Sequence, residues 1–332
     1  MGLRIGLGLG LNKQGLARFV SVDEQIQLFK QRIQNDNGKF EAQQCLDDLI
    51  NQGLFDNANF VLTPNGYKAG KLYALKPENG DLDVTWVRNG NATRVNQNGL
   101  IESVGNNVPR LDYLAGNCPS ILVEEQRTNL FNFSDGTASN YGGFGYTSQL
   151  NDWGIGLNNK IIVPNSDSFR LDIDSGVSTG FHVFTFFVKK SNGTTPVLGD
   201  DFRVQIGGST IVDGVNGTIS VDLFKDDIYK IVASANINIG GSSNRVLSGT
   251  ISKSLEISGF QIEQASIATS YIPTSGTPVT RPADAPPPIT VPIGTTEIVE
   301  ALEDGTFNTI TTIPAEYTIP FGRFKYILFN GA

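Results

Sequence analysis

The chain has 332 residues, enough for two or three modest domains, each with its own core. Its 37 glycines, single methionine and 17% charged residues, with recurring Val, Ile, Thr, Phe and Tyr, indicate a mainly β protein rather than a helical enzyme. A net charge of −8 argues against binding nucleic acid through a general basic surface. No apolar run approaches the length of a membrane span, and we expect neither a membrane partner nor a cofactor.

The two cysteines, Cys45 and Cys118, are far apart in the sequence. Two cysteines are too few for a disulfide framework or for a zinc site with four cysteine ligands. One bridge between them is an alternative, but we expect two buried free thiols, with Cys45 packed on the apolar side of a helix.

Within the first 14 residues, glycine and leucine alternate from position 6 to position 11. Leu7, Leu9 and Leu11 alternate with glycines, so an extended chain has leucine on one face and bare backbone on the other. A dinucleotide-binding fingerprint would need glycine where this chain has Leu11. Glycine interrupts every apolar stretch here, so we expect no signal peptide. The alternative is a flexible tail, but we expect these leucines to anchor the chain by adding to a neighbouring one.

Two short amphipathic helices are predicted next. Ser21 and Glu24 form a capping box, and apolar residues follow at helical spacing up to Ile33. A second helix is predicted over residues 39–52, with one apolar stripe made of Ala42, Cys45, Leu46, Leu49 and Ile50. The two helices predict a helical hairpin, and residues 1–58 are expected to form the anchoring segment.

Residues 59–130 are predicted to form a β-rich connector domain. Pro64-Asn65-Gly66 is typical of a turn with a glycine at positive φ, and Asn98-Gly99 of a β-hairpin. The charged residues of this region are expected to form structural ion pairs rather than an acid–base catalyst; they are Arg94, Arg110, Asp112, Glu124, Glu125 and Arg127.

Residues 131–280 carry strands in quick succession, at a spacing typical of a β-sandwich or jelly roll. The stretch 181–188 is apolar on both faces and predicts a central strand. It contains His182, the only histidine, which we expect to be hydrogen-bonded in the core. A serine–histidine–carboxylate triad would have to use His182, and the chain has no Gly-x-Ser-x-Gly elbow.

The loop over residues 134–159 is the ligand-binding candidate. It sets four aromatic residues among glycine, asparagine and serine: Tyr141, Phe144, Tyr146 and Trp153. Aromatic faces stack on sugar rings, while amides and hydroxyls bond to the sugar hydroxyls. The alternative is that these rings fold back onto the sandwich or pack on a sister chain.

Metal and hydrolase chemistry have weaker support. A histidine-based metal site lacks partner residues, and no metal site is predicted. No pair of carboxylates stands out for glycoside hydrolysis. Two acidic pairs lie at expected turns, where they are either solvated or calcium ligands: Asp200-Asp201 and Asp226-Asp227.

The end of the sandwich is predicted within residues 259–265. An extended exit follows through Tyr271-Ile272-Pro273, because proline fixes its own backbone and extends the residue before it. Residues 281–294 are typical of a stiff proline-rich linker. Residues 295–332 are predicted to form a small, separate β unit with a hairpin turn at Asp304-Gly305, stabilised by oligomerisation.

Four phrases in this order resemble those of phage virion fibre and appendage proteins with a lectin-like β-sandwich. The family belongs to tailed phages of gut Bacteroidetes (crAss-like or similar). The phrases are ATRVNQNGLIE at 92–102, PRLDY at 109–113, ILVEEQRTNL at 121–130, and a final segment at 261–284 with Gln261-Ile262-Glu263 and ATSYIPT. The likeness covers about residues 59–284 and extends into the C-terminal tail.

The resemblance implies a structural virion protein of the head or tail. It would dock on other virion proteins through its N-terminus and present its sandwich for adhesion to host-surface glycans. Family analogy favours a homotrimer. One alternative is a purely architectural capsid or tail component without a ligand. The least favoured is a polysaccharide depolymerase, and we expect no enzyme activity.

Overall fold

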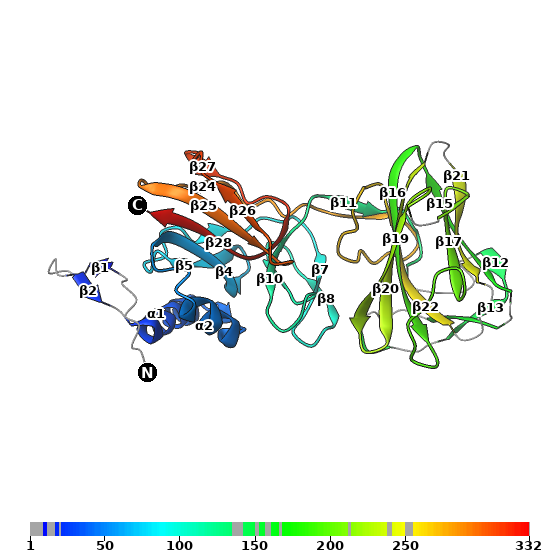
Figure 1. Cartoon of the computed structure of the whole chain (residues 1–332), viewed down its shortest axis with the longest axis horizontal. Helices are drawn as coiled ribbons and strands as arrows, with labels where there is room; N and C mark the ends of the chain where they lie inside the picture. The colour runs from blue at the N-terminus through cyan, green and yellow to red at the C-terminus, as the bar shows by residue number, and fades with distance from the viewer. Residues whose placement is uncertain are drawn as a thin grey trace. The chain divides into compact units, whose positions relative to one another are not determined.

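The computed structural model describes residues 9–11, 17–19, 21–134, 142–149, 153–156, 161–165, 168–211, 214–237, 241–249 and 255–331. The described part is mainly β, with two short helices and several antiparallel sheets, as the composition predicts (Figure 1). The chain divides into two compact units. The first comprises residues 1–98, 103–125 and 282–332, and the second comprises residues 99–102 and 126–281.

The first unit is built on a nine-stranded sheet. Six of its strands lie in the order β26 (Phe307–Ile310), β25 (Thr295–Leu302), β28 (Gly322–Gly331), β4 (Ala58–Lys68), β5 (Lys71–Lys76) and β6 (Val84–Thr85). The remaining strands are β10 (Ser120–Val123), which pairs with β28 and with β9 (Arg110–Asp112), and β3 (Lys39–Phe40), which pairs with β4. β24 (Ile289–Thr290) pairs with β27 (Glu316–Tyr317) in this unit, and elsewhere β7 (Ala92–Val95) pairs with β8 (Ile101–Val104).

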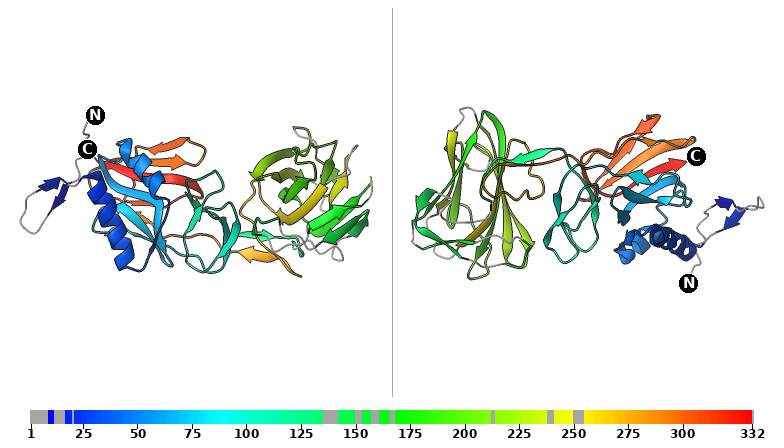
Figure 2. Two further views of the ribbon diagram at one scale, coloured as in Figure 1. Left: turned by 90° about the horizontal axis from the view of Figure 1, so that it is seen from below. Right: turned by 180° about the vertical axis from the view of Figure 1, so that it is seen from behind.

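Cores lie on both faces of this sheet. Helices α1 (Val22–Asn35) and α2 (Gln43–Asn51) cover one face, where Ile33 and Leu46 pack with sheet residues such as Val61 (Figure 2). The opposite face holds a second core that includes Phe60 and Phe329. Because both faces are covered, β4 is buried along nearly its whole length.

The first helix begins as the sequence predicts. The backbone N–H of Glu24 donates to Ser21 Oγ at 3.2 Å, which closes one half of the capping box. Ile26, Phe29 and Ile33 are buried, and each contributes about 1.5–3 kcal/mol through its apolar area.

The second helix is shorter than predicted. It begins at Gln43 rather than near Lys39, because Lys39 and Phe40 pair with β4 as a strand. Ala42 then adopts a left-handed conformation with φ of 54°, which separates the strand from the helix. The local sequence has the helical pattern from residue 39, but it does not reveal that the first residues pair with a distant strand instead.

The turn predicted at Pro64-Asn65-Gly66 is wrong. These residues continue β4, which passes through a register irregularity between Leu62 and Tyr67. A Cβ at position 66 would overlap the side chain of Ile33. Because Gly66 has no Cβ, α1 can approach the sheet closely.

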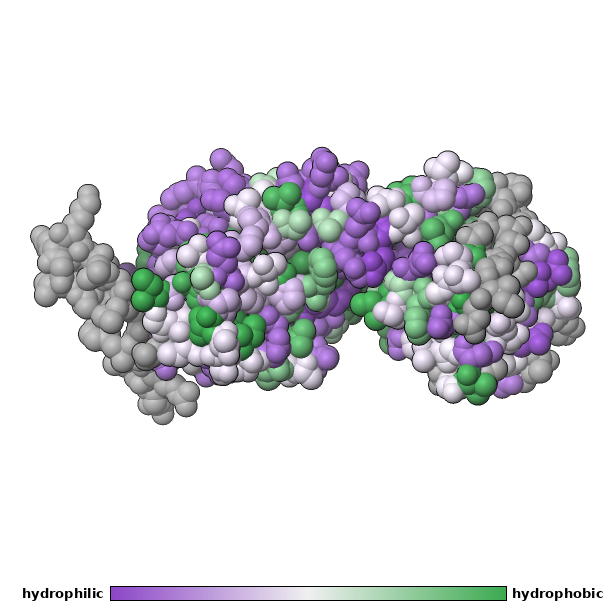
Figure 3. Space-filling view, turned by 90° about the horizontal axis from the view of Figure 1, so that it is seen from above, coloured by the Kyte–Doolittle hydropathy of each residue, from purple (hydrophilic) through white to green (hydrophobic). Residues whose placement is uncertain are grey.

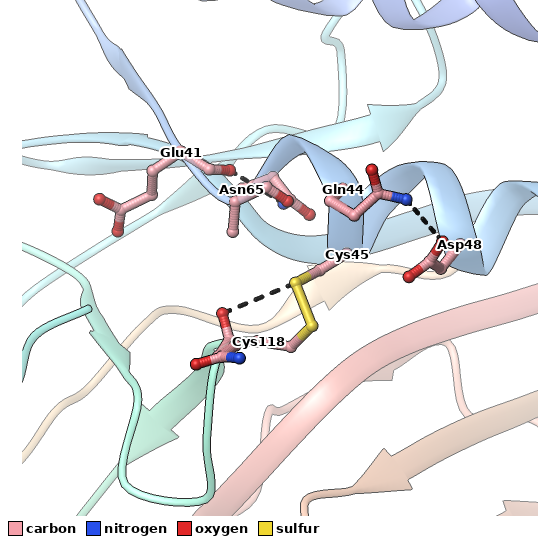
Figure 4. The surroundings of a disulfide bond; sticks show 8 residues. Glu41, Gln44, Cys45, Asp48, Asn65 and Cys118 are labelled. Carbon is pink, nitrogen blue, oxygen red and sulfur yellow. Dashed lines mark hydrogen bonds between the residues drawn. A yellow bond between two sulfur atoms is a disulfide. The ribbon is translucent and has the colours of Figure 1, made fainter. Parts of the chain in front are cut away.

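Cys45 and Cys118 form a disulfide, so the expectation of two free buried thiols is wrong. The bond joins α2 to the loop between β9 and β10, across a separation of 73 residues and a Cα–Cα distance of 5.6 Å (Figure 4). Cys118 is exposed and Cys45 half-buried. The pairing depends on long-range folding that neither local sequence reveals.

The C-terminal strands differ from the separate unit that the sequence predicts. β25 and β28 lie within the nine-stranded sheet, where Phe329 pairs with Phe60 of β4. The proline-rich segment before them is partly packed rather than a wholly exposed linker, since Asp284 is buried and Ile289 pairs with Tyr317. The hairpin turn at Asp304-Gly305 is confirmed between β25 and β26.

Two other hairpin features are clear. Gly99 has a φ of 72° between β7 and β8, as the Asn98-Gly99 signal predicts. Near the N-terminus, β1 (Leu9–Leu11) pairs with β2 (Ala17–Phe19), so Leu9 and Leu11 lie in a strand that pairs within its own chain. Leu7 lies outside the described residues. None of the helices in the described part of the chain is long and apolar enough to cross a membrane.

The second unit is a β-sandwich, as predicted. Its five-stranded sheet has the order β12 (Gly142–Phe144), β15 (Arg170–Val177), β21 (Gly241–Ser248), β17 (Phe202–Ile206) and β18 (Ser209–Thr210). Its six-stranded sheet has the order β13 (Tyr146–Gln149), β14 (Ile161–Pro164), β22 (Leu255–Glu263), β16 (Gly180–Lys190), β20 (Ile228–Ile237) and β19 (Thr218–Lys225).

One core joins the two sheets. Phe184 and Phe186 of the six-stranded sheet pack with Phe202 and Leu171 of the five-stranded sheet. β16 is central in its sheet, between β22 and β20, which confirms the expectation from its two apolar faces. Alternate residues of the five-stranded sheet, such as Arg170 and Arg203, point away from this core.

The segment after β22 is held against the sandwich by buried polar groups. Asn129 donates to the carbonyl oxygen of Ile272 at 2.9 Å and accepts from the N–H of Ile262 at 3.0 Å. Glu263 is fully buried and accepts from the N–H of Thr269 at 3.0 Å. Nearby, β11 (Arg127–Asn129) pairs with β23 (Val279–Arg281). The phrases RTNL and ATSYIPT thus contain residues that hold the segment after β22 against the sandwich.

Candidate functional site

Polar side chains gather on the outer face of the five-stranded sheet, beside one exposed aromatic ring. Along β15, Leu171 and Ile173 are fully buried in the core, so Arg170 and Asp172 face outward. The same alternation holds along β17 and β21. We call this surface the arginine face; it comprises Phe144, Arg170, Asp172, Arg203, Gln205, Thr210, Arg245 and Leu247.

The strand register arranges the arginine face in two rows that run across the strands. The first row is Phe144, Arg170, Leu247 and Arg203. The second is Gly142, Asp172, Arg245, Gln205 and Thr210. Neighbouring strands lie about 4.8 Å apart, so the second row extends over roughly 19 Å. That length suits an extended ligand lying across the sheet.

Asp172 is the centre of an ion-pair network. Its carboxylate lies 2.7 Å from Arg245 Nε and 2.9 Å from Arg170 Nη2. Arg245 Nη1 donates to Gln205 Oε1 at 3.3 Å, and Gln205 Nε2 donates to Thr210 Oγ1 at 3.0 Å. These contacts restrict the side chains before any ligand arrives, which lowers the entropic cost of binding.

Phe144 supplies the apolar part of this surface. Its side chain is 53% exposed, and the guanidinium of Arg170 lies 5.6 Å from the ring centroid. Its neighbour Gly143 has a φ of 106°, and a Cβ there would overlap the carbonyl of Arg170. Only glycine lets β12 approach β15 so closely. An exposed ring beside fixed donors and acceptors can stack on the apolar face of a sugar.

The structure does not bring the three described members of the predicted aromatic group, Phe144, Tyr146 and Trp153, together on one surface. Tyr146 is half-buried against the core, and its hydroxyl donates to the carbonyl oxygen of Gly142 at 2.7 Å. Burial, and then the charge of Asp172, raise the pKa of Tyr146. Trp153 is half-buried and donates through Nε1 to Glu256 of β22 at 2.7 Å. Tyr141 lies outside the described residues, so Phe144 is the predicted residue that the arginine face contains.

Sequence reasoning missed the charged part of the arginine face. The signal was present, because polar and apolar residues alternate in FRLDID at 169–174 and in FRVQI at 202–206. The sequence could not show that β15, β21 and β17 are neighbours. In the chain β21 follows β17, whereas in the sheet β21 lies between β15 and β17.

A second group of arginines lies inside the first unit. Arg110 Nη1 is 2.6 Å from Glu124, Arg88 Nη1 is 2.8 Å from Asp284, and Arg110 also pairs with Asp284. All four side chains are buried; we call them the buried arginine cluster. Burial by itself would lower the pKa of Arg110, but Glu124 and Asp284 raise it.

The buried arginine cluster matches the expected role of Arg110 and Glu124 in a structural ion pair. Other members of the expected group are elsewhere: Asp112 pairs with Arg323, and Arg94 lies 3.7 Å from Glu41. The positive charges of two arginines are balanced by the negative charges of two carboxylates, and all four side chains are buried. The cluster is therefore structural.

Three of the remaining candidates, His182, Asp201 and Asp227, have structural partners. His182 is buried in β16, with Nδ1 3.1 Å from the carbonyl oxygen of Gly180. Asp201 pairs with Lys190 and Asp227 with Lys189, each at 2.9 Å. Among the residues that the structure describes, no group of three or more His, Cys, Asp or Glu is placed to hold a metal ion.

An open pocket of about 380 Å³ lies beside the disulfide in the first unit. Cys45, Asn65, Cys118, Glu303 and Lys325 contribute to its lining. Cys45 Sγ is 3.7 Å from the carbonyl oxygen of Asn117, and Asn65 Nδ2 donates to the carbonyl oxygen of Glu41 at 3.0 Å (Figure 4). The amide of Asn65 thus holds the backbone before α2, and none of the described residues that line the pocket is aromatic.

Comparison with known proteins does not supply a function. No family model matches the chain, and a search of curated proteins finds no relative.

Proposed function

We propose that this protein is a structural component of a tailed-phage particle and presents its β-sandwich for adhesion to host-surface glycans. The arginine face is the observation that carries the adhesion part of this proposal. It combines the exposed ring of Phe144 with hydrogen-bonding groups held in fixed positions, a combination suited to sugars. The four phrases that resemble virion appendage proteins support the setting.

The disulfide also supports a particle that works outside a cell. Disulfides persist in oxidising surroundings, and reducing compartments open accessible ones. Cys118 is exposed, so reductants could reach the Cys45–Cys118 bond. A bond in this position suits the exterior of a released particle.

Docking on the particle is assigned to the N-terminal segment. In this proposal the strand that contains Leu9 and Leu11 adds to a neighbouring virion protein, and the chain assembles as a homo-oligomer, with a trimer favoured by analogy. Immunogold electron microscopy of intact particles would locate the protein on head or tail. Absence of label from purified particles would contradict the virion assignment.

A purely architectural role is the second candidate, and exposed apolar residues of the first unit favour it. Phe307 on the edge strand β26 is 62% exposed, and Phe321 is 59% exposed. An exposed edge strand with a bulky apolar residue suits packing between subunits. The face in Figure 3 shows hydrophobic residues in small separate patches among hydrophilic ones, rather than as one broad apolar surface.

A glycan array with the purified full chain separates the two candidates. Adhesion predicts binding to specific glycans that Phe144→Ala weakens by about tenfold, corresponding to about 1.4 kcal/mol. Phe181→Ala is the matched control, because Phe181 is in the same unit and is also 53% exposed. Absence of binding to every glycan, with an intact oligomer, would favour the architectural role.

A further inference from the structure

The described side chains of the arginine face carry more positive than negative charge, although the protein is acidic. Among its described side chains, Arg170, Arg203 and Arg245 stand against the single carboxylate of Asp172. The whole chain carries a net charge of −8. A local cationic surface on such a chain attracts anions while the rest of the protein repels them.

Two of these arginines have N–H donors without a partner among the residues that the structure describes. Arg203 is exposed and donates through Nε to the carbonyl oxygen of Ser248 at 2.9 Å. Among the described residues, its two terminal nitrogens have no partner. Arg245 uses Nε for Asp172 and Nη1 for Gln205, which leaves Nη2 without a partner in the described part of the chain. Planar guanidinium groups with free N–H donors are suited to carboxylates.

The spacing of these groups matches an extended chain of sugars. Arg170 and Arg203 lie in one row with Leu247 between them, so they are two strand spacings apart, or about 10 Å. A pyranose unit is about as long as one strand spacing. Anionic groups on alternate units would therefore meet Arg170 and Arg203, while Phe144 stacks on the unit at the sheet edge.

We propose that the ligand of the arginine face is an acidic oligosaccharide that carries carboxylate groups, as uronic acids do. The chain lies across the strands along the two rows. Arg170, Arg203 and Arg245 bind its carboxylates, and Gln205 and Thr210 bind its hydroxyls. This inference rests on the proposed adhesive function and specifies the chemistry of its ligand.

The test uses the full chain and a panel of acidic capsular polysaccharides, each paired with its carboxyl-reduced form. Reduction removes the charge and retains the sugar chain. We expect at least one acidic polysaccharide to bind, and reduction to weaken its binding about tenfold or more, as the loss of charged hydrogen bonds implies. Binding should also weaken as salt is raised.

Variants of single residues then test whether the polysaccharide binds on the arginine face. Arg203→Gln should weaken binding of the acidic polysaccharide about tenfold. Lys230→Gln is the charge-matched control, because Lys230 lies on the six-stranded sheet, and it should bind as the parent does. Arg170→Gln repeats the test if the Arg203 variant loses its folded structure, as judged by circular dichroism.

The outcomes distinguish this inference from the proposed function. Equal binding to the acidic and reduced forms, or binding to neutral glycans alone, would overturn the acidic ligand and leave adhesion standing. Binding unchanged in both arginine variants would overturn the assigned face. Absence of binding to all glycans would contradict both proposals.

Discussion

The arginine face and the buried arginine cluster use the same residue types for different purposes. The buried arginine cluster contains two arginines and two carboxylates, and Arg88, Arg110 and Asp284 are nearly inaccessible to solvent. The arginine face has three arginines and one carboxylate, all partly exposed. Balanced charges sealed from water stabilise a fold only as a set. Unbalanced charges at the surface add little stability and remain able to bind a ligand.

The largest expected effect is the removal of one member of the buried arginine cluster. Asp284→Ala leaves Arg88 and Arg110 without their shared carboxylate. An uncompensated buried charge typically costs about 3–5 kcal/mol. Denaturant unfolding should show this loss in the first unit, whereas Asp81→Ala at an exposed position should have little effect. A loss below about 1 kcal/mol for Asp284→Ala would contradict the structural role of the cluster.

Removing the disulfide should destabilise the first unit somewhat less than Asp284→Ala does. The bond closes a long loop, with a separation of 73 residues, and native disulfides contribute about 2–4 kcal/mol. We expect the double variant Cys45→Ser/Cys118→Ser to lower the calorimetric transition of the first unit. The transition of the sandwich serves as the internal control, and an equal shift in both would contradict this assignment.

Polar groups inside the sandwich are expected to matter more than those on its arginine face. Asn129→Ala removes hydrogen bonds to the backbone of Phe131, Phe260, Ile262 and Ile272. Buried backbone groups left without partners cost about 1–3 kcal/mol. Thermal unfolding should reveal a loss in this range, while Asn236→Ala on an exposed position of β20 should change little. Similar stabilities for the two variants would argue against the role of Asn129.

The smallest expected effect on stability comes from the arginine face itself. Arg245→Gln breaks a partly exposed pair with Asp172, and such pairs contribute about 0–1 kcal/mol. Unfolding should therefore be nearly unchanged, although binding of an acidic glycan weakens. A stability loss as large as that of Asp284→Ala would show that the arginine face stabilises the fold as strongly as the buried arginine cluster does.

Local sequence patterns predicted the parts of the fold that depend on neighbours in the chain. The capping box at Ser21, the hairpin at Asn98-Gly99 and the central strand with Phe184 each follow from a few adjacent residues. The sandwich followed from the spacing of its strands. These features need no knowledge of distant partners.

Long-range pairing accounts for what the sequence did not reveal. The disulfide, the inclusion of β28 beside β4, and the start of α2 at Gln43 all depend on segments far apart in the chain. The same reason applies to the site. Phe144 was predicted from its aromatic neighbours, whereas Arg203 and Arg245 become neighbours of Arg170 only through the strand order of the sheet.

A structure of the full chain bound to an acidic oligosaccharide tests the central claim most directly. We expect the sugar chain to lie across β12, β15, β21 and β17, with one ring on Phe144 and carboxylates at Arg170 and Arg203. An oligosaccharide bound instead in the pocket beside Cys45 and Cys118, or on the six-stranded sheet, would contradict the account.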